Sequence, residues 1–217
     1  RTASGMNGRK RDRARRRAKK PPRRAGREPI GLRIVGGRFR GNKLEYAGDP
    51  RVRPMKDRLR EAVFNLVGPS VREKHALDLF AGTGAVGLEA LSRGARRATL
   101  VEQHVPTVKT IRRNVAHLGV ESLCDVVTAS AFLWAKRLEE IGPDAWIVFC
   151  SPPYDFYVER TAEMTDLIAR LIESAPPESI FVVESDARFH REQLPEPDAW
   201  DVRSYPPAVV AIYRKHG

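Results

Sequence analysis

The sequence has few of the features that mark several classes of protein. Its 217 residues include two cysteines, Cys124 and Cys150, which lie far apart at the ends of apolar segments, so we expect reduced buried thiols rather than a disulfide. The five histidines have no metal-ligand spacing, and we expect no metal site. No apolar stretch approaches the roughly 20 residues of a membrane span, and no signal-peptide core follows the basic start. These absences predict a soluble, cytoplasmic protein that does not contact membranes.

Acidic residues are scarce at the front of the chain, where most of the net charge of +12 is concentrated. Residues 1–28 carry 13 Lys or Arg but only Asp12 and Glu28, for a net charge of +11. Residues 29–60 add +6, and the remaining residues sum to −5. A basic front on a weakly acidic body is typical of a protein that approaches nucleic acid from one end.

Two units are predicted in this basic front. Residues 1–28 contain almost no apolar residue, and we expect a disordered tail that grips RNA; a solubilising leader and an organellar transit peptide are the alternatives. Residues 29–60 are predicted to form a small β extension, because short apolar stretches are separated by glycines. The candidate RNA contacts of this extension are its basic residues, Arg33, Arg38, Arg40, Lys43, Arg53, Lys56, Arg58 and Arg60.

Residues 61–217 form the third predicted unit, in which strand-like and helical patterns alternate. Strands are predicted at 75–80, 98–102, 124–128, 145–150, 180–184 and 208–213, and helices at 85–93, 106–118, 131–141 and 158–173. Pro106 and Gly119 delimit one helix, since proline suits the first helical turn and glycine the residue past the end. Repeated strand-helix units predict an α/β fold, with a mostly parallel sheet covered by helices on both faces.

A glycine-rich loop, Gly82-Thr83-Gly84-Ala85-Val86-Gly87, follows the first of these strands and opens a helix. Its glycines allow the backbone to approach a ligand, and the helix N-terminus offers free N–H groups to an anion. Glu102 stands 20 residues after Gly82 at the end of the next strand, where its carboxylate suits two ribose hydroxyls. The pattern predicts a nucleoside cofactor, and the alternative is a tight turn beside an incidental surface glutamate.

Asp78 distinguishes the two cofactors that suit this architecture, a dinucleotide and S-adenosylmethionine. A buried acid needs a partner, and the ammonium group of the methionine part supplies one that a dinucleotide lacks. The segment from Asp78 to Gly84 therefore favours S-adenosylmethionine, and it resembles the first motif of the class I methyltransferases. The candidate cofactor-binding residues are Asp78, Phe80, Gly82, Thr83, Gly84, Glu102, Gln103, Ser130 and Ala131.

The tetrapeptide Ser151-Pro152-Pro153-Tyr154, which follows the predicted strand 145–150, supplies the candidate catalytic residues. Consecutive prolines end a strand because they lack N–H donors, and a plain turn is the alternative interpretation. The tetrapeptide resembles the [Asp/Asn/Ser]-Pro-Pro-[Tyr/Phe] motif of enzymes that methylate exocyclic amino groups of bases. In that role the Ser151 hydroxyl and the Pro152 carbonyl accept the two amine hydrogens and orient the nitrogen lone pair. Tyr154 offers a face on which a flipped base stacks.

Three longer stretches narrow the resemblance: Leu32 to Gly41, Arg53 to Glu61, and Asp78 to Ala95. Together they resemble the RsmD family of bacterial guanine-N2 methyltransferases of small-subunit (16S) ribosomal RNA, over about residues 30–213. The resemblance implies a seven-stranded methyltransferase sheet, a small N-terminal β extension, and a target on ribosomal RNA or an assembling small subunit. The family usually has Asp or Asn at the place of Ser151, Thr at Met55 and an acid at Ser130.

Two other functions stay open at this point. One is N6 methylation of adenine in DNA or RNA, because serine in the first position of the tetrapeptide also occurs in that wider group. The other is an RNA-binding assembly factor whose methyltransferase fold is catalytically weak. For each of them, as for the guanine-N2 enzyme, we expect a monomer.

Overall fold

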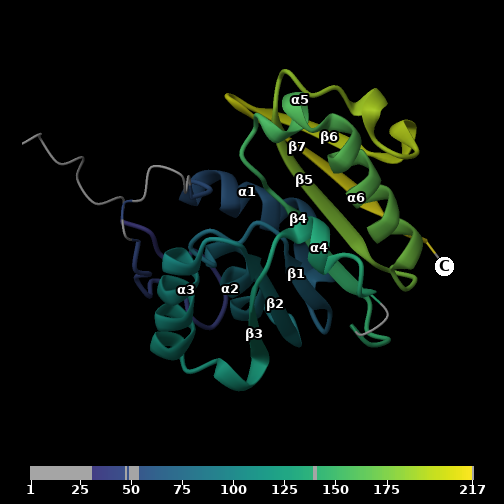
Figure 1. Cartoon of the computed structure of the whole chain (residues 1–217). Helices are drawn as coiled ribbons and strands as arrows, with labels where there is room; N and C mark the ends of the chain where they lie inside the picture. The colour runs from purple at the N-terminus through teal and green to yellow at the C-terminus, as the bar shows by residue number, and fades with distance from the viewer. Residues whose placement is uncertain (1–30, 47, 49–53, 139–140, 217) are drawn as a thin grey trace, which may run out of the picture.

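The computed structural model in Figure 1 describes residues 31–46, 48, 54–138 and 141–216. The predicted tail, residues 1–28, and the candidate RNA contact Arg53 lie outside the described residues. The helices of the described part are α1 (Asp57–Val67), α2 (Ala85–Ser92), α3 (Val105–Leu118), α4 (Ala131–Trp134), α5 (Phe156–Glu159) and α6 (Thr161–Ser174). The strands are β1 (His75–Asp78), β2 (Arg97–Glu102), β3 (Cys124–Thr128), β4 (Trp146–Cys150), β5 (Ile180–Asp186), β6 (Asp201–Tyr205) and β7 (Ala208–Arg214).

The strands form one seven-stranded sheet in the order β3-β2-β1-β4-β5-β7-β6. The first five strands in that order are parallel, whereas β7 pairs antiparallel with both β5 and β6. The strand order reverses direction between β1 and β4, so the carboxyl ends of these two strands flank a crevice that suits a ligand. The predicted α/β architecture is confirmed.

Side chains alternate across the sheet and divide the core into two layers, as the period of two in a strand requires. Ile147 and Phe149 of β4 pack with α1, α2 and α3 on one face, whereas Trp146, Val148 and Cys150 pack with α4, α5 and α6 on the other. Figure 1 shows the same division of the helices about the sheet. Both faces of the central strands are therefore buried, and the edge where the strands end is the place left for a site.

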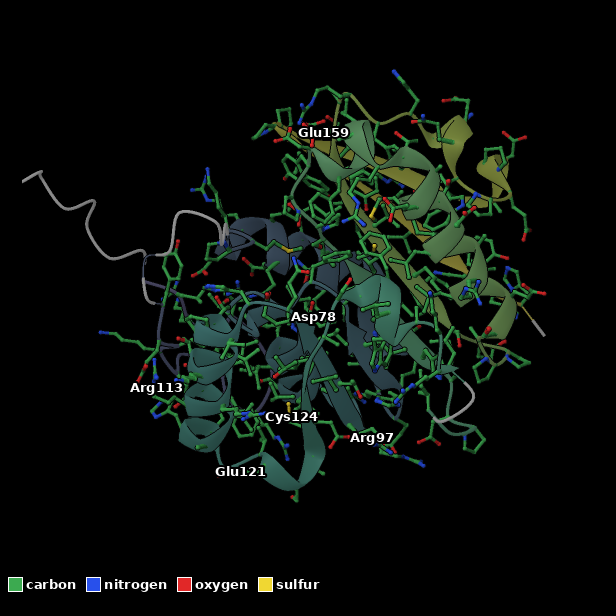
Figure 2. The ribbon with its side chains drawn as sticks, viewed as in Figure 1. Asp78, Arg97, Arg113, Glu121, Cys124 and Glu159 are labelled. Carbon is green, nitrogen blue, oxygen red and sulfur yellow. The ribbon has the colours of Figure 1, made fainter. Side chains whose placement is uncertain are left out.

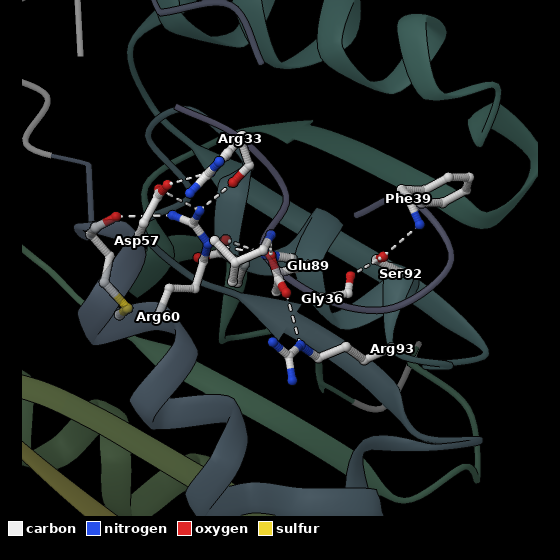
Figure 3. Close-up of polar contacts among 12 residues, drawn as sticks. Arg33, Gly36, Phe39, Asp57, Arg60, Glu89, Ser92 and Arg93 are labelled. Atoms are coloured by element: carbon white, nitrogen blue, oxygen red, sulfur yellow. Dashed lines mark hydrogen bonds and ion pairs between the residues drawn. The ribbon is translucent and has the colours of Figure 1, made fainter. Parts of the chain in front are cut away.

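Helix α2 anchors the N-terminal segment 31–46 to the sheet (Figure 3). The buried Glu89 carboxylate accepts the Val35 N–H at 2.8 Å. The Ser92 hydroxyl donates to the Gly36 carbonyl at 2.6 Å and accepts the Phe39 N–H at 2.9 Å. Since α2 begins at the glycine-rich loop, these contacts fix the basic segment relative to that loop.

Asn114 of α3 makes a second anchor. Its side chain accepts the Glu45 N–H at 2.7 Å and donates to the Glu45 carbonyl at 3.1 Å. The same side-chain amide donates to the carbonyl of Thr83, within the glycine-rich loop, at 3.1 Å. One buried side chain thus links the end of the basic segment to the loop.

The structure differs from the predicted elements in four places. The helix predicted at 131–141 ends at Trp134, because the N–H groups of Lys136 and Arg137 bond to carbonyls three residues back and tighten the chain into turns. The helix predicted at 158–173 is divided into α5 and α6 at Arg160, whose φ of −130° is not helical. In the described part of the predicted β extension, the β pairing is an isolated antiparallel bridge between Arg33 and Lys43.

Strand β6 is the fourth difference, since no strand was predicted at 201–205. Its residues Asp201 to Ser204 are exposed, and it pairs with β7 alone at the edge of the sheet. An edge strand with no buried face lacks the apolar alternation that sequence patterns detect.

In the described part of the chain, no helix is long and apolar enough to cross a membrane.

Candidate active site

The site lies at the carboxyl edge of the parallel strands, where a cavity of about 1230 Å³ opens. Figure 2 shows the direction of the strands: Arg97 and Cys124, which begin β2 and β3, lie far from Asp78, which ends β1. Of the predicted site residues, those that line the cavity are Lys56, Arg58, Phe80, Gly82, Glu102, Gln103, Ser130, Ala131, Ser151, Pro152, Pro153 and Tyr154. The cavity therefore brings the glycine-rich loop, the ends of several strands and the tetrapeptide together.

The glycine-rich loop leaves β1 and enters α2 through two glycines with positive φ. Gly82 has a φ of +51° and Gly84 a φ of +77°, values in the left-handed region that favours glycine. A Cβ at Gly84 would also lie only 3.2 Å from Ile111 and 3.3 Å from Leu100. Gly82 lines the cavity, whereas Gly84 and the buried Thr83 lie behind its lining and shape the turn.

Glu102, at the end of β2, is held by two backbone amides. One carboxylate oxygen accepts the Gly82 N–H at 3.0 Å, and the other accepts the His104 N–H at 2.8 Å. Because each carboxylate oxygen has two lone pairs, the carboxylate keeps capacity for further donors while its orientation is fixed. This arrangement suits recognition of a pair of hydroxyls.

Asp78 is buried behind the loop and does not line the cavity. Its carboxylate accepts the N–H of Gly87 in the first turn of α2 at 3.0 Å. Burial raises the pKa of Asp78 to about 7, although the Gly87 hydrogen bond opposes that shift. The structure thus gives Asp78 a backbone partner, and its pairing with a cofactor ammonium stays a prediction.

The tetrapeptide turns away from the sheet directly after β4. Ser151 lines the cavity, and its hydroxyl oxygen is buried without a hydrogen-bond partner among the described residues, as are His75 Nδ1 and Trp146 Nε1. A buried polar atom without a partner is costly, and pairing of the Ser151 hydroxyl with a ligand stays a prediction. The Tyr154 hydroxyl donates to the Glu184 carboxylate at 2.7 Å, which ties the turn to β5.

Several cavity residues were not predicted from the sequence. Glu184 and Asp186 enter from β5, and Arg188 joins Asp155 and Asp186 at 2.9 and 2.8 Å. Glu184 is only 7% exposed, and the one signal available in the sequence was its position as the last residue of the predicted strand 180–184. Other lining residues come from loops and from β6 and β7, namely Tyr205, Pro206, Pro207 and Ala208.

An aromatic wall closes one side of the cavity. Phe80, Phe132 and Phe156 lie with ring centroids 6.1 to 6.4 Å apart. The guanidinium of Arg160 stacks over Phe132 at 4.2 Å and over Phe156 at 4.9 Å. Cys150 of β4 lies in the same layer of the core as these rings, and burial raises the pKa of its thiol to about 12.

Five of the candidate RNA contacts are exposed: Arg38, Arg40 and Lys43 on the N-terminal segment, and Lys56 and Arg58 at the mouth of the cavity. Arg33 is also largely exposed and pairs with Asp57 at 3.1 Å. These six basic side chains are therefore accessible at the surface, and their contact with RNA stays a prediction.

Arg60 is a correction, since its side chain is fully buried and the prediction that it contacts RNA is wrong. It pairs with Asp57 at 2.9 Å and Glu89 at 3.4 Å, and it donates to the carbonyls of Met55 and Arg33 (Figure 3). Arg60 lies on the same face of α1 as Val63 and Val67, a spacing that the sequence shows. Its charge therefore stabilises the attachment of the N-terminal segment.

Comparison with known proteins identifies the family. The family model "Conserved hypothetical protein 95" matches residues 32–214. Ribosomal RNA small subunit methyltransferase D of Escherichia coli K12 is 34% identical over 171 residues, which cover 75% of this chain and 84% of that protein. The chain belongs to the RsmD family. The Haemophilus influenzae member of the RsmD family is 29% identical over 186 residues, covering 84% of this chain and 92% of that protein.

Solved structures agree with RsmD membership. The Escherichia coli protein yhhF has a TM-score of 0.68 and 32% identity, and the match covers 85% of this chain and 98% of yhhF. The predicted class I methyltransferase fold is confirmed, and so is S-adenosylmethionine as the cofactor of this RsmD-family chain. The unpartnered Ser151 hydroxyl and the doubly anchored Glu102 fit that cofactor and its reaction.

Proposed function

We propose that this protein methylates the exocyclic N2 of a guanine in 16S ribosomal RNA. The observation that carries the proposal is the Ser151 hydroxyl, which is buried without a partner among the described residues although Ser151 is a residue that lines the cavity. The names of the matched relatives, ribosomal RNA small subunit methyltransferases, support small-subunit RNA as the substrate. A base amine offers the two N–H donors that the hydroxyl and the adjacent Pro152 carbonyl are suited to accept.

The tetrapeptide prepares a poor nucleophile for attack. The lone pair of an amine conjugated to a purine ring is spread into the ring, so the amine must be held with that lone pair localised and aimed. Ser151 and the carbonyl of Pro152 hold the two amine hydrogens, and the rigid proline pair fixes the distance between these acceptors. Tyr154 stacks on the flipped base, which loses its stacking partners in the RNA.

The cofactor residues act together at the other side of the cavity. When bound, S-adenosylmethionine supplies a methyl group on a positively charged sulfur. We propose that Glu102 accepts its ribose hydroxyls, that Asp78 receives its ammonium, and that Ser130 accepts its adenine amine. The remaining proposed contacts are Phe80, Gly82, Gln103 and Ala131, which line the cavity, and Thr83 and Gly84, which lie behind its lining.

The basic segment supplies the RNA-binding surface. Arg33, Arg38, Arg40, Lys43, Lys56 and Arg58 are proposed to contact phosphates, with Arg53 and the tail of residues 1–28 contributing from outside the described residues. Lys56 and Arg58 line the cavity mouth, so they meet the phosphates next to the flipped base. We also propose the division into residues 1–28, 29–60 and 61–217, a cytoplasmic location and a monomeric state.

Nucleoside mapping tests the proposal. Ribosomal RNA from a strain that lacks this gene should lose one N2-methylguanosine, and purified wild-type protein with S-adenosylmethionine should restore it on isolated small subunits. The Ser151→Ala variant is the matched control and should restore it slowly. An unchanged N2-methylguanosine map with a missing N6-methyladenosine would support the adenine enzyme instead. A full map together with retained RNA binding would support the assembly factor.

A further inference from the structure

We propose that Glu184 distinguishes guanine from adenine in this cavity, by accepting a hydrogen bond from the ring N1–H of the target base. The inference rests on the proposed function and identifies the residue that sets its base specificity.

Strand register places Glu184 beside Ser151. Cys150, the last residue of β4, pairs in parallel with Val183 of β5. Ser151 directly follows β4, and Glu184 follows Val183 within β5. Adjacent strands lie about 4.8 Å apart, so the turn at Ser151 begins beside Glu184. Both line the cavity.

The side chains of Ser151 and Glu184 are expected to point to the same side of the sheet. Phe149 and Val182, two residues earlier on each strand, both pack in the layer of α1, α2 and α3. Because residues i and i+2 of a strand share a face, Ser151 and Glu184 continue that face at the strand ends. It is also the face where Met55, Lys56 and Leu59 close the cavity from the N-terminal side.

The Glu184 carboxylate is buried and held by a tyrosine. It is 7% exposed, and one of its oxygens accepts the Tyr154 hydroxyl hydrogen at 2.7 Å. A carboxylate accepts about four hydrogen bonds, so this bond orients the group without saturating it. In a buried site such an acceptor attracts further N–H donors and repels lone pairs.

That preference matches one of the two purines. In guanine the ring N1 carries a hydrogen and stands next to the amine-bearing carbon, whereas in adenine the ring N1 beside the amine carries a lone pair. An amine held at Ser151 therefore brings N1 toward the neighbouring carboxylate. Guanine then donates to Glu184, and adenine would direct a lone pair at it. A hydrogen bond to a charged group contributes a discrimination of about 10- to 100-fold.

A base analogue in the substrate tests this role. 2-Aminopurine keeps the exocyclic amine of guanine but has a lone pair at N1 and lacks the O6 oxygen, so the Glu184 variant is needed to assign the effect to N1. The substrate is a small subunit reconstituted with ribosomal RNA that carries either base at the mapped target position. Wild-type protein should methylate the guanine substrate with a kcat/KM about 10- to 100-fold higher. In Glu184→Gln that ratio should fall below about threefold, because the amide N–H donates to the N1 lone pair.

Glu173→Gln is the matched control. It makes the same change at an exposed glutamate of α6 that does not line the cavity, and it should keep the wild-type ratio. Binding of S-adenosylmethionine, measured by calorimetry, shows that each variant is folded. If Glu184→Gln fails that measurement, Tyr154→Phe keeps the carboxylate but removes the hydrogen bond that orients it, and its ratio should lie between the wild-type ratio and about threefold.

Two results would overturn the role of Glu184. One is wild-type protein that methylates both bases at equal rates. The other is a guanine to 2-aminopurine ratio of kcat/KM that stays at the wild-type value in the folded Glu184→Gln variant. If Tyr154→Phe replaces that variant, an unchanged ratio in Tyr154→Phe has the same meaning. Failure of the proposed function gives a different result, since wild-type protein would then transfer no methyl group to N2 of either base.

Discussion

The carboxylate of Glu89 accepts the Val35 N–H at 2.8 Å while pairing with Arg60 at 3.4 Å and Arg93 at 2.8 Å, and it is completely buried. A backbone donor from the N-terminal segment and two cations from different helical turns therefore meet on one side chain (Figure 3). The basic segment is attached to the methyltransferase sheet by a charged centre as well as by apolar contacts.

Glu89→Gln should destabilise the protein by about 3 kcal/mol, because it leaves the buried Arg60 charge short of a partner. Urea denaturation followed by circular dichroism measures the change. Glu163→Gln removes a carboxylate of the same size from the exposed pair with Arg160 and should leave the unfolding midpoint unchanged. Equal midpoints for wild type and Glu89→Gln would contradict a structural role for this charge.

The pKa of Asp78 predicts a pH dependence of stability. Burial raises this pKa from 3.8 to about 7, so the folded chain holds a proton that the unfolded chain releases as the pH passes about 4. Between about pH 4 and pH 7 the unfolded chain is ionised at this residue while the folded chain stays protonated. The free energy of unfolding therefore falls by about 1.4 kcal/mol for each pH unit in this range, and it stops falling above about pH 7, where Asp78 is ionised in both states. Asp78→Asn keeps an oxygen for the Gly87 N–H and should lack this slope. Unfolding free energies of both proteins at pH 5 and 7.5 test the difference, and parallel pH profiles would contradict it.

Ser151→Ala should lower kcat by about 10- to 100-fold, because the target amine loses one of the acceptors that orient its lone pair. The Kd for S-adenosylmethionine, measured by calorimetry, should change little, since the tetrapeptide is proposed to contact the base rather than the cofactor. Ser151→Asp keeps an acceptor oxygen and should retain turnover. Full activity of Ser151→Ala would show that the hydroxyl does not orient the amine.

The exposed basic residues of the N-terminal segment should govern the salt dependence of RNA binding. Combined substitution of Arg38, Arg40 and Lys43 by Gln should flatten the slope of log K against log salt by about 0.7 to 0.9 for each phosphate that is no longer neutralised. The matched control replaces three exposed cations on the opposite layer, Lys136, Arg137 and Arg170, and should keep the wild-type slope. Deletion of residues 1–28 tests the tail in the same assay. Identical slopes for all four proteins would place RNA binding elsewhere.

Local patterns in the sequence predicted most of the sheet and the parts of the site that lie within one segment. The glycine-rich loop, Glu102 and the tetrapeptide stand where the strand ends were expected, because short buried runs locate the central strands well. Glu184 was missed because parallel pairing, and not proximity in sequence, brings it to Ser151. Arg60 was assigned to the surface by its charge, although its helical spacing from Val63 places it on the buried face of α1.

Exposure explains the remaining differences. Strand β6 gains its backbone hydrogen bonds from β7 at the sheet edge and buries almost nothing, so its composition carries no strand signal. The helix expected at 131–141 continues as tight turns beyond Trp134, and its apolar pattern reflects the burial of Ala135 and Leu138 rather than helical continuity. Pattern analysis detects burial, and it identifies secondary structure only where the two coincide.

The Cys150 thiol lies one residue before the tetrapeptide, next to the proposed methyl-transfer site. A sulfur anion is a far stronger nucleophile than a base amine, so a thiolate at this position would compete for alkylation. Burial raises the pKa of Cys150 to about 12, so the thiol stays neutral at physiological pH. We therefore expect this cysteine to escape alkylation by the cofactor that the neighbouring residues are proposed to use.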